Sequence, residues 1–293
     1  MSAVLATAAA PAQPLVGPNV ILMGPAGTGK TYSIGTLVDW ATAHQKRVFV
    51  LFTEQGLEAL LGYWRDAGKP VPECLHWKQT ITRPLSLESL INGAELTGKM
   101  SYKALTEMID PKRGDNNSFW QILVACKDLV SDRDGTKFGN IATLGLDTIF
   151  VIDGLSELSN AAMKMQIGAK PTASPSDYGV AQNQIMNFIR LLTQGISTTF
   201  VLISHVSREV NEVTGITVLG VKSVGKALAS EIPQLFSDVI YTVRELDKFY
   251  WDTAAFGVDT KTRSLGYRSK INPDFAQIMD VWLKRGGAGE TKS

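Results

Sequence analysis

Residues 24–31 read GPAGTGKT and match the phosphate-binding pattern G-x-x-x-x-G-K-[ST] without a gap. Glycines let the backbone curl so that successive N–H groups point at phosphate oxygens, and the following helix adds its positive end. We expect the Lys30 ammonium to reach the β- and γ-phosphates and the Thr31 hydroxyl to bind Mg²⁺. The predicted nucleoside triphosphate site consists of Gly24, Pro25, Ala26, Gly27, Thr28, Gly29, Lys30, Thr31 and Tyr32.

The residues around this loop have the order that phosphate binding needs. Asn19–Met23 form a predicted buried strand, and the apolar residues after the loop share one face of a helix. Further buried strands are predicted at residues 47–52, 147–153 and 199–204, and a short one at 74–77, with helices between them. This alternation predicts an α/β fold with a mostly parallel central sheet flanked by helices.

An acidic residue at the end of a buried strand is the second feature expected of such a site. Ile149–Asp153 has this form, with four apolar residues followed by a carboxylate. We expect Asp153 to hold Mg²⁺, because carboxylates that end strands beside a phosphate loop have this role. Capping of the next helix by Asp153 is the alternative.

The catalytic base is predicted at the end of another strand. Val48–Phe52 runs into Glu54, which could orient and deprotonate the attacking water. AAA+ ATPases place this glutamate directly after the aspartate, where this chain has Gly154, whereas the RecA-like class places it at the end of the neighbouring strand. Glu54 is therefore preferred to Glu157, and a simple helix-start charge at Glu54 is the remaining alternative.

A histidine follows the strand Phe200–Ser204. RecA-like motors carry a polar residue at this strand end, where it senses the γ-phosphate and signals to the following loop. His205 fits this role in position and type, and a purely structural histidine is the alternative.

Composition limits what the rest of the chain does. The 293 residues are 44% hydrophobic, which suffices for a full core, and the net charge of +1 gives no general attraction to nucleic acid. Cys74 and Cys126 lie far apart in the sequence, which argues against a disulfide framework and suits a reducing cytoplasm. No apolar run approaches the length of a membrane span, so no membrane partner is expected.

The domain plan follows from the same patterns. We expect a flexible N-terminal tail over residues 1–17, a single ATPase domain over residues 18–285, and a flexible C-terminal tail over residues 286–293. Residues 100–146 are interpreted as a helical insertion. The β-rich C-terminal part is predicted from short segments at 239–243, 249–254 and 264–271, which precede a helix at 275–283.

Several stretches together resemble the phage-encoded RecA-like P-loop ATPases of single-strand annealing recombination systems. In chain order they are GPAGTGKT, FTEQG, IFVIDGLSEL, the helix containing SDYG and MNFIRLL, FVLISHV, and GKALASEIPQLFSDVIYTV. The likeness covers roughly residues 18–271, so it includes most of the chain. Two departures are the long stretch between Met100 and Asp147 and the unmatched part past Phe275.

The resemblance implies a RecA-like ATPase that uses ATP and Mg²⁺ at the interfaces of a head-to-tail homo-oligomer, a ring or a filament. It implies action on single-stranded DNA, with a phage annealing or replication protein as a further partner in the host cytoplasm. It also implies that residues 264–271 form a strand, on which Arg268 and Lys270 point to one face and reach the neighbouring subunit's site.

Candidates for DNA contacts directly follow the predicted sensor His205. Arg208, Lys222 and Lys226 lie in the segment 206–226, and ordinary surface charge is the alternative. Two other functions stay open, namely an AAA+ type helicase loader or remodeller and a nucleotide-gated DNA-binding scaffold with little turnover. A small-molecule kinase would need an arginine-rich lid, which the sequence lacks.

Overall fold

The computed structural model describes residues 15–81, 87–101, 103–104, 117–168, 173–210 and 217–287. The strands of its main sheet are β1 (Asn19–Met23), β2 (Arg47–Phe52), β3 (Leu75–Gln79), β6 (Thr148–Asp153), β7 (Thr199–Ser204), β10 (Asp238–Glu245) and β11 (Lys248–Asp252). They form a seven-stranded sheet in the order β11-β10-β1-β7-β6-β2-β3. All neighbours pair in parallel except β11, which is antiparallel to β10 at one edge.

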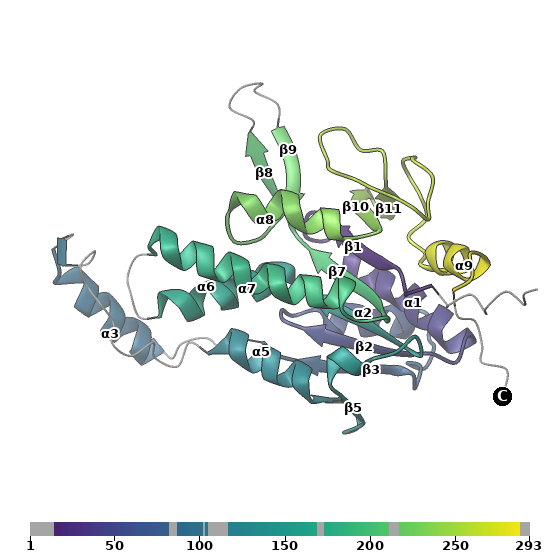
Figure 1. Ribbon diagram of the computed structural model, residues 1–293, viewed down its shortest axis with the longest axis horizontal. Helices are drawn as coiled ribbons and strands as arrows, with labels where there is room; N and C mark the ends of the chain where they lie inside the picture. The colour runs from purple at the N-terminus through teal and green to yellow at the C-terminus, as the bar shows by residue number, and fades with distance from the viewer. Residues whose placement is uncertain are drawn as a thin grey trace, which may run out of the picture.

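Helices cover both faces of this sheet (Figure 1). One face packs against α1 (Lys30–Ala43), α2 (Leu57–Arg65) and α9 (Ala276–Lys284). The other packs against α5 (Ser118–Lys127), α6 (Leu155–Ile167), α7 (Pro175–Gln194) and α8 (Gly225–Glu231). Successive strand side chains alternate between the two cores, so Val20 and Leu22 lie in the first and Ile21 and Met23 in the second.

Smaller elements project from this core. A hairpin of β8 (Val206–Val210) and β9 (Thr217–Val221) stands beside α8, and α3 (Leu87–Gly98) extends away from the sheet (Figure 1). The described part of the predicted insertion 100–146 contains α5, a short hairpin of β4 (Leu129–Val130) and β5 (Lys137–Gly139), and the 3₁₀ helix η1 (Ile141–Thr143). A second 3₁₀ helix, η2 (Ile232–Leu235), follows α8.

The predicted fold class is confirmed, because the core is an α/β sheet that is mostly parallel and flanked by helices, with a C-terminal part that adds strands. The strand predicted at residues 264–271 is wrong. These residues form bends, and only Ile271 makes a bridge, to Trp251 of β11. The segment is held instead by Asp238, whose buried carboxylate accepts hydrogen bonds from Thr262, Arg263 and Ser264.

The ends of the described chain lie side by side. Leu15 forms a bridge with Gly287, and the backbone carbonyl of Val16 accepts a hydrogen bond from the Trp282 indole. The described residues of the two predicted tails are therefore attached to the core. Residues 1–14 and 288–293 lie outside the described residues.

Candidate nucleotide-binding site

Four parallel strands bring the predicted site together at one edge of the sheet. The phosphate loop follows β1, Glu54 follows β2, Asp153 ends β6 and His205 follows β7. These strands are neighbours in the order β1-β7-β6-β2, so their carboxyl ends meet at the same edge. A cleft of about 600 Å³ at this edge is lined by Lys30, Thr31 and Glu54 together with Asp153 and His205.

The phosphate loop has the backbone that its glycines predict. Gly27 and Gly29 have φ angles of 72° and 77°, which residues with a Cβ rarely adopt. Helix α1 begins directly after the loop at Lys30, so its free N–H groups face the cleft. The Thr28 hydroxyl hydrogen-bonds to the Pro25 carbonyl at 2.8 Å and to the Thr242 hydroxyl of β10 at 2.7 Å. The loop is therefore tied to the neighbouring strand.

Lys30 is held inside the loop. Its side chain is only 6% exposed, and its ammonium donates hydrogen bonds to the carbonyls of Gly24 at 2.9 Å and Pro25 at 2.7 Å. Burial lowers the pKa of Lys30 to about 8, while the charges of Asp153 and Glu54 act in the opposite direction. A cation in this position faces the loop where phosphate oxygens would be bound.

Asp153 and Thr31 are in direct contact. The Thr31 hydroxyl donates a hydrogen bond of 2.7 Å to Oδ2 of Asp153, which is 2% exposed. Burial raises the pKa of Asp153 to about 6, a shift that Glu54 increases and that the Thr31 hydrogen bond opposes. A hydroxyl and a carboxylate are the oxygen ligands that Mg²⁺ takes at nucleotide sites, so these two residues fit the predicted metal. The N-cap residue of α6 is Gly154, not Asp153.

Glu54 and His205 lie next to each other at the mouth of the cleft. The distance from Oε1 of Glu54 to Nε2 of His205 is 3.6 Å, and both side chains are partly exposed. Glu157 has a different position, since it lies in the first turn of α6 and accepts a hydrogen bond from Asn160. Glu54 lines the cleft, whereas Glu157 is absent from its lining.

Gly56, which belongs to the stretch FTEQG, supports this arrangement. A Cβ atom on Gly56 would lie 2.4 Å from Oδ2 of Asp153. Only glycine therefore lets the turn between Glu54 and α2 pack against the carboxylate. Beside this turn β2 and β6 pair in parallel, with Phe52 opposite Asp153.

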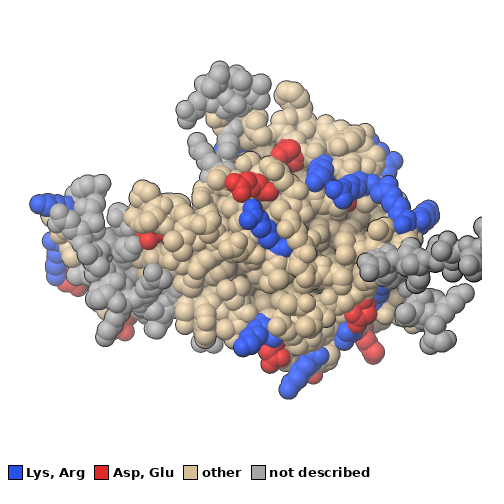
Figure 2. All heavy atoms as spheres, in the orientation of Figure 1, with Lys and Arg blue, Asp and Glu red and all other residues tan. Residues whose placement is uncertain are grey.

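Arg268 and Lys270 lie away from this cleft in their own chain. The ammonium of Lys270 is 2.7 Å from Oε2 of Glu245, and the Arg268 guanidinium donates to Gln277 at 3.4 Å. The expectation that both side chains alternate on one strand is wrong, because the segment is not a strand and Lys270 has a φ of 57°. Figure 2 shows Lys and Arg side chains grouped over the C-terminal loops beside β11 and α9.

The candidate DNA residues lie in three successive places, on β8, in the loop after β9 and in α8. Arg208 is exposed on β8, which continues directly from His205. Lys222 is exposed after β9, and its backbone N–H donates to the His205 carbonyl at 2.8 Å. Lys226 lies in α8. The hairpin is thus joined at its base to the residue that was predicted as the sensor.

Five residues of the cleft lining are not among the predicted site residues, namely Gln55, Ala59, Ile203, Arg244 and Phe249. Arg244 of β10 and Phe249 of β11 line the cleft opposite Glu54, and the guanidinium lies 5.8 Å from the ring centroid. Neither residue belongs to a recognisable motif. Their place depends on the antiparallel pairing of β10 with β11, which sets Arg244 opposite Phe249.

Comparisons with known proteins give likenesses among solved structures. Neither a protein-family model nor a curated protein matches this sequence. Among solved structures, the chain is similar to the assembled ATPase EscN of the type III secretion system of enteropathogenic E. coli, with 14% identity and a TM-score of 0.39. The match covers 84% of this chain and 48% of EscN, so the chain spans about half the length of that ATPase. None of the helices in the described residues is long and apolar enough to cross a membrane.

Proposed function

We propose that this chain is a Mg²⁺-dependent ATPase. The observation that supports this most strongly is the convergence of five side chains, from the loops after four neighbouring strands, on one cleft. They are Lys30, Thr31, Glu54, Asp153 and His205. A glycine-rich turn with a structural role alone would not need a buried lysine, a buried carboxylate and a second carboxylate in the same cleft.

Each side chain has a part in the proposed reaction. Lys30 pairs with the β- and γ-phosphates, and Thr31 and Asp153 hold the metal. Mg²⁺ would neutralise the charge that develops on the phosphate oxygens. Glu54 accepts a hydrogen bond from the attacking water, aligns it with the γ-phosphate and takes its proton. Arg244 also lines the cleft, beside Phe249, and could pair with a phosphate of the nucleotide.

The proposal includes action on single-stranded DNA by a homo-oligomer, in phage recombination or replication. The resemblance to RecA-like phage ATPases supports it, as does the connection of the β8–β9 hairpin to His205. In this arrangement His205 senses the γ-phosphate beside Glu54, and its movement shifts the hairpin with Arg208 and Lys222. A neighbouring subunit would complete the site with Arg268 or Lys270.

The test is ATP hydrolysis with and without Mg²⁺ and with and without single-stranded DNA. We expect Mg²⁺-dependent hydrolysis that single-stranded DNA stimulates. In His205→Ala, basal hydrolysis should fall modestly and the stimulation should largely disappear, because the link to the hairpin is cut. Equal loss of both activities would indicate a structural histidine. Binding of ATP and DNA without turnover would favour the nucleotide-gated scaffold, and no ATP binding would refute the proposal.

A further inference from the structure

A second hollow adjoins the phosphate loop on the side of α1. It has a volume of about 390 Å³, and its walls come from α1, α2, β11 and the loop before α9. The residues that line it are Gly29, Tyr32, Ser33, Thr36, Tyr63, Phe249, Asn272, Pro273 and Asp274. The hollow lies within the size range of sites for small organic ligands, roughly 300–1,000 Å³.

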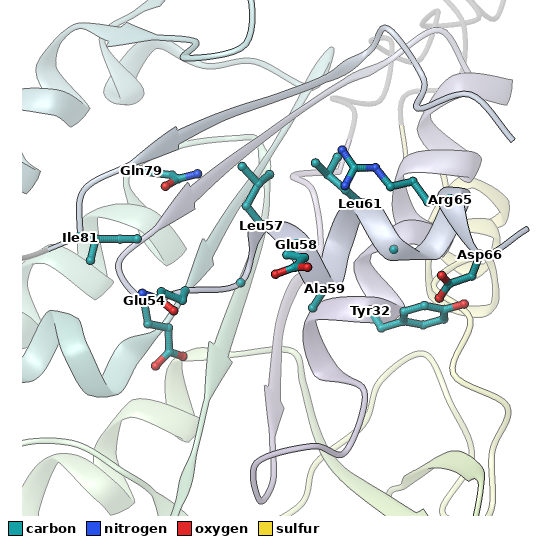
Figure 3. A pocket seen from close by; sticks show the side chains of 13 residues that line it. Tyr32, Glu54, Leu57, Glu58, Ala59, Leu61, Arg65, Asp66, Gln79 and Ile81 are labelled. Atoms are coloured by element: carbon teal, nitrogen blue, oxygen red, sulfur yellow. The ribbon is translucent and has the colours of Figure 1, made fainter. Parts of the chain in front are cut away.

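Another hollow, of about 830 Å³, lies along α2 on the other side of Tyr32 (Figure 3). Its lining includes the carboxylates of Glu54, Glu58 and Asp66. Figure 3 shows Glu54 at one end of it and Tyr32 with Asp66 at the other. The hollow along α2 thus opens at the predicted catalytic base, where the γ-phosphate and the water must lie.

A nucleotide has a direction in a phosphate loop. Lys30 would bind the β- and γ-phosphates, and Glu54 would bind the water beyond the γ-phosphate. The nucleobase must therefore lie at the end of the phosphate loop that is distant from Glu54. The hollow beside α1 meets this condition, since it opens at Gly29, Tyr32 and Ser33 and does not include Glu54 or Asp153. The hollow along α2 opens at Glu54, so it lies beside the γ-phosphate and not at the end where the nucleobase must lie.

The walls of the α1 hollow suit a flat aromatic ring. The Phe249 ring lies over Gly29, where a Cβ atom would come within 2.9 Å of Cγ of the ring. Opposite, Tyr63 and Tyr32 form an edge-to-face pair with centroids 5.1 Å apart, and the Tyr63 hydroxyl donates to Asp39 at 3.0 Å. Tyr63 is therefore held in place, and Phe249, which lines the hollow, supplies an aromatic ring beside which a nucleobase can pack.

Asn272 supplies a polar group in the lining of the α1 hollow. Within the described residues no hydrogen bond holds its side-chain amide, although its backbone carbonyl accepts from Gln277 and Asp274. An amide presents one donor and one acceptor side by side, which matches the edge of adenine. Guanine presents two acceptors there and matches arginine or lysine instead.

We propose that the α1 hollow binds the base of the nucleotide, with Phe249 as the stacking residue and Asn272 as the residue that selects adenine over guanine. This assignment rests on the proposed function, because it requires the triphosphate to lie in the loop. It adds the nucleobase subsite and its specificity, which the phosphate motif does not determine.

Binding of ATP, GTP and inorganic tripolyphosphate, measured by calorimetry in the presence of Mg²⁺, tests the proposal. Wild-type protein should bind all three, with ATP tighter than GTP. Phe249→Ala should weaken ATP binding by roughly 5- to 150-fold, the range for loss of one stacking contact, and weaken tripolyphosphate binding by a much smaller factor, because the ring also packs over Gly29. Phe249→Trp should restore ATP binding, and Phe256→Ala, at a ring that is 93% exposed, is the matched control.

Asn272→Ala should reduce the preference for ATP over GTP by a similar factor. Glu58→Gln, in the hollow along α2, is the control and should keep this preference. If the Phe249 and Asn272 variants bind all three ligands like wild type, or lose tripolyphosphate binding by the same factor as ATP binding, the assignment is overturned. Wild-type protein that binds tripolyphosphate but shows no preference for ATP overturns it as well. Wild-type protein that binds neither ATP nor tripolyphosphate refutes the proposed function and this inference with it.

Discussion

Two regions of the molecule are held in place by different interactions. One consists of the loops after β1, β2, β6 and β7, and the other is the segment 261–271. The loops begin at the ends of a parallel ladder, whose register fixes where each one starts. The segment 261–271 is held by the buried carboxylate of Asp238, by hydrogen bonds between Thr253 and residues 266 and 268, and by isolated bridges to β10 and β11. The first arrangement brings distant residues to one place, whereas the second leaves Lys270 paired with Glu245 on the surface.

This difference teaches where a sequence pattern is a reliable guide. A buried strand has a fixed rise per residue and a fixed direction, so the residue after it has a predictable place. A segment held by side-chain hydrogen bonds follows no such period.

The largest effect is expected at the strand end after β2. Glu54→Gln should bind Mg-ATP with normal affinity and hydrolyse it roughly 10²–10⁴-fold more slowly, because the amide cannot take the proton from water. Steady-state hydrolysis and equilibrium binding measure the two effects separately. Glu157→Gln, on α6, is the control and should keep most activity. A reversed result for the two variants would assign the base to Glu157.

The loop after β1 should give the next effect. Lys30→Ala should weaken ATP binding by about 100-fold, because the phosphates lose the buried cation that the loop holds in place. Calorimetric titration with ATP measures it, with circular dichroism to confirm the fold. ATP affinity equal to that of wild type would show that this loop does not bind phosphate.

Loss of the carboxylate that holds the C-terminal segment should change stability rather than chemistry. Asp238→Ala leaves Thr262, Arg263 and Ser264 without their acceptor, which we expect to cost roughly 3 kcal/mol. The melting temperature should then fall by about 6–12 °C, as thermal unfolding can measure. Asp259→Ala, an exposed carboxylate in the same part of the chain, should melt like wild type. No difference between the two variants would contradict the role given to Asp238.

The smallest effect on binding is expected at Lys270. Because this exposed lysine lies outside the cleft of its own chain, Lys270→Ala should bind ATP like wild type. It should nevertheless hydrolyse ATP poorly, because its role in hydrolysis would be in the site of a neighbouring subunit. Equal mixtures of Lys270→Ala and Glu54→Gln should then regain activity, since some interfaces combine an intact Glu54 with an intact Lys270. Co-assembled mixtures that remain inactive would exclude Lys270 from the chemistry.

The sequence by itself predicted the α/β class and placed Lys30, Thr31, Glu54, Asp153 and His205 at strand ends. These predictions are possible because the alternation of buried strands and helices fixes which residues face the carboxyl edge of the sheet. The strand order could not be predicted from the sequence. The contact between Glu54 and His205 depends on this order, because β2 and β7 lie on the two sides of β6.

The positions of Arg244 and Phe249 in the cleft, and the hollow beside α1, depend on the tertiary structure. Arg244 and Phe249 come together through the pairing of β10 with β11, and Asn272 reaches the same region from a loop with no periodic pattern. Such positions depend on packing between segments far apart in the chain, and no local spacing of residues encodes them. The sequence therefore determined which residues are candidates for phosphate contacts, and the fold decided which other residues surround them.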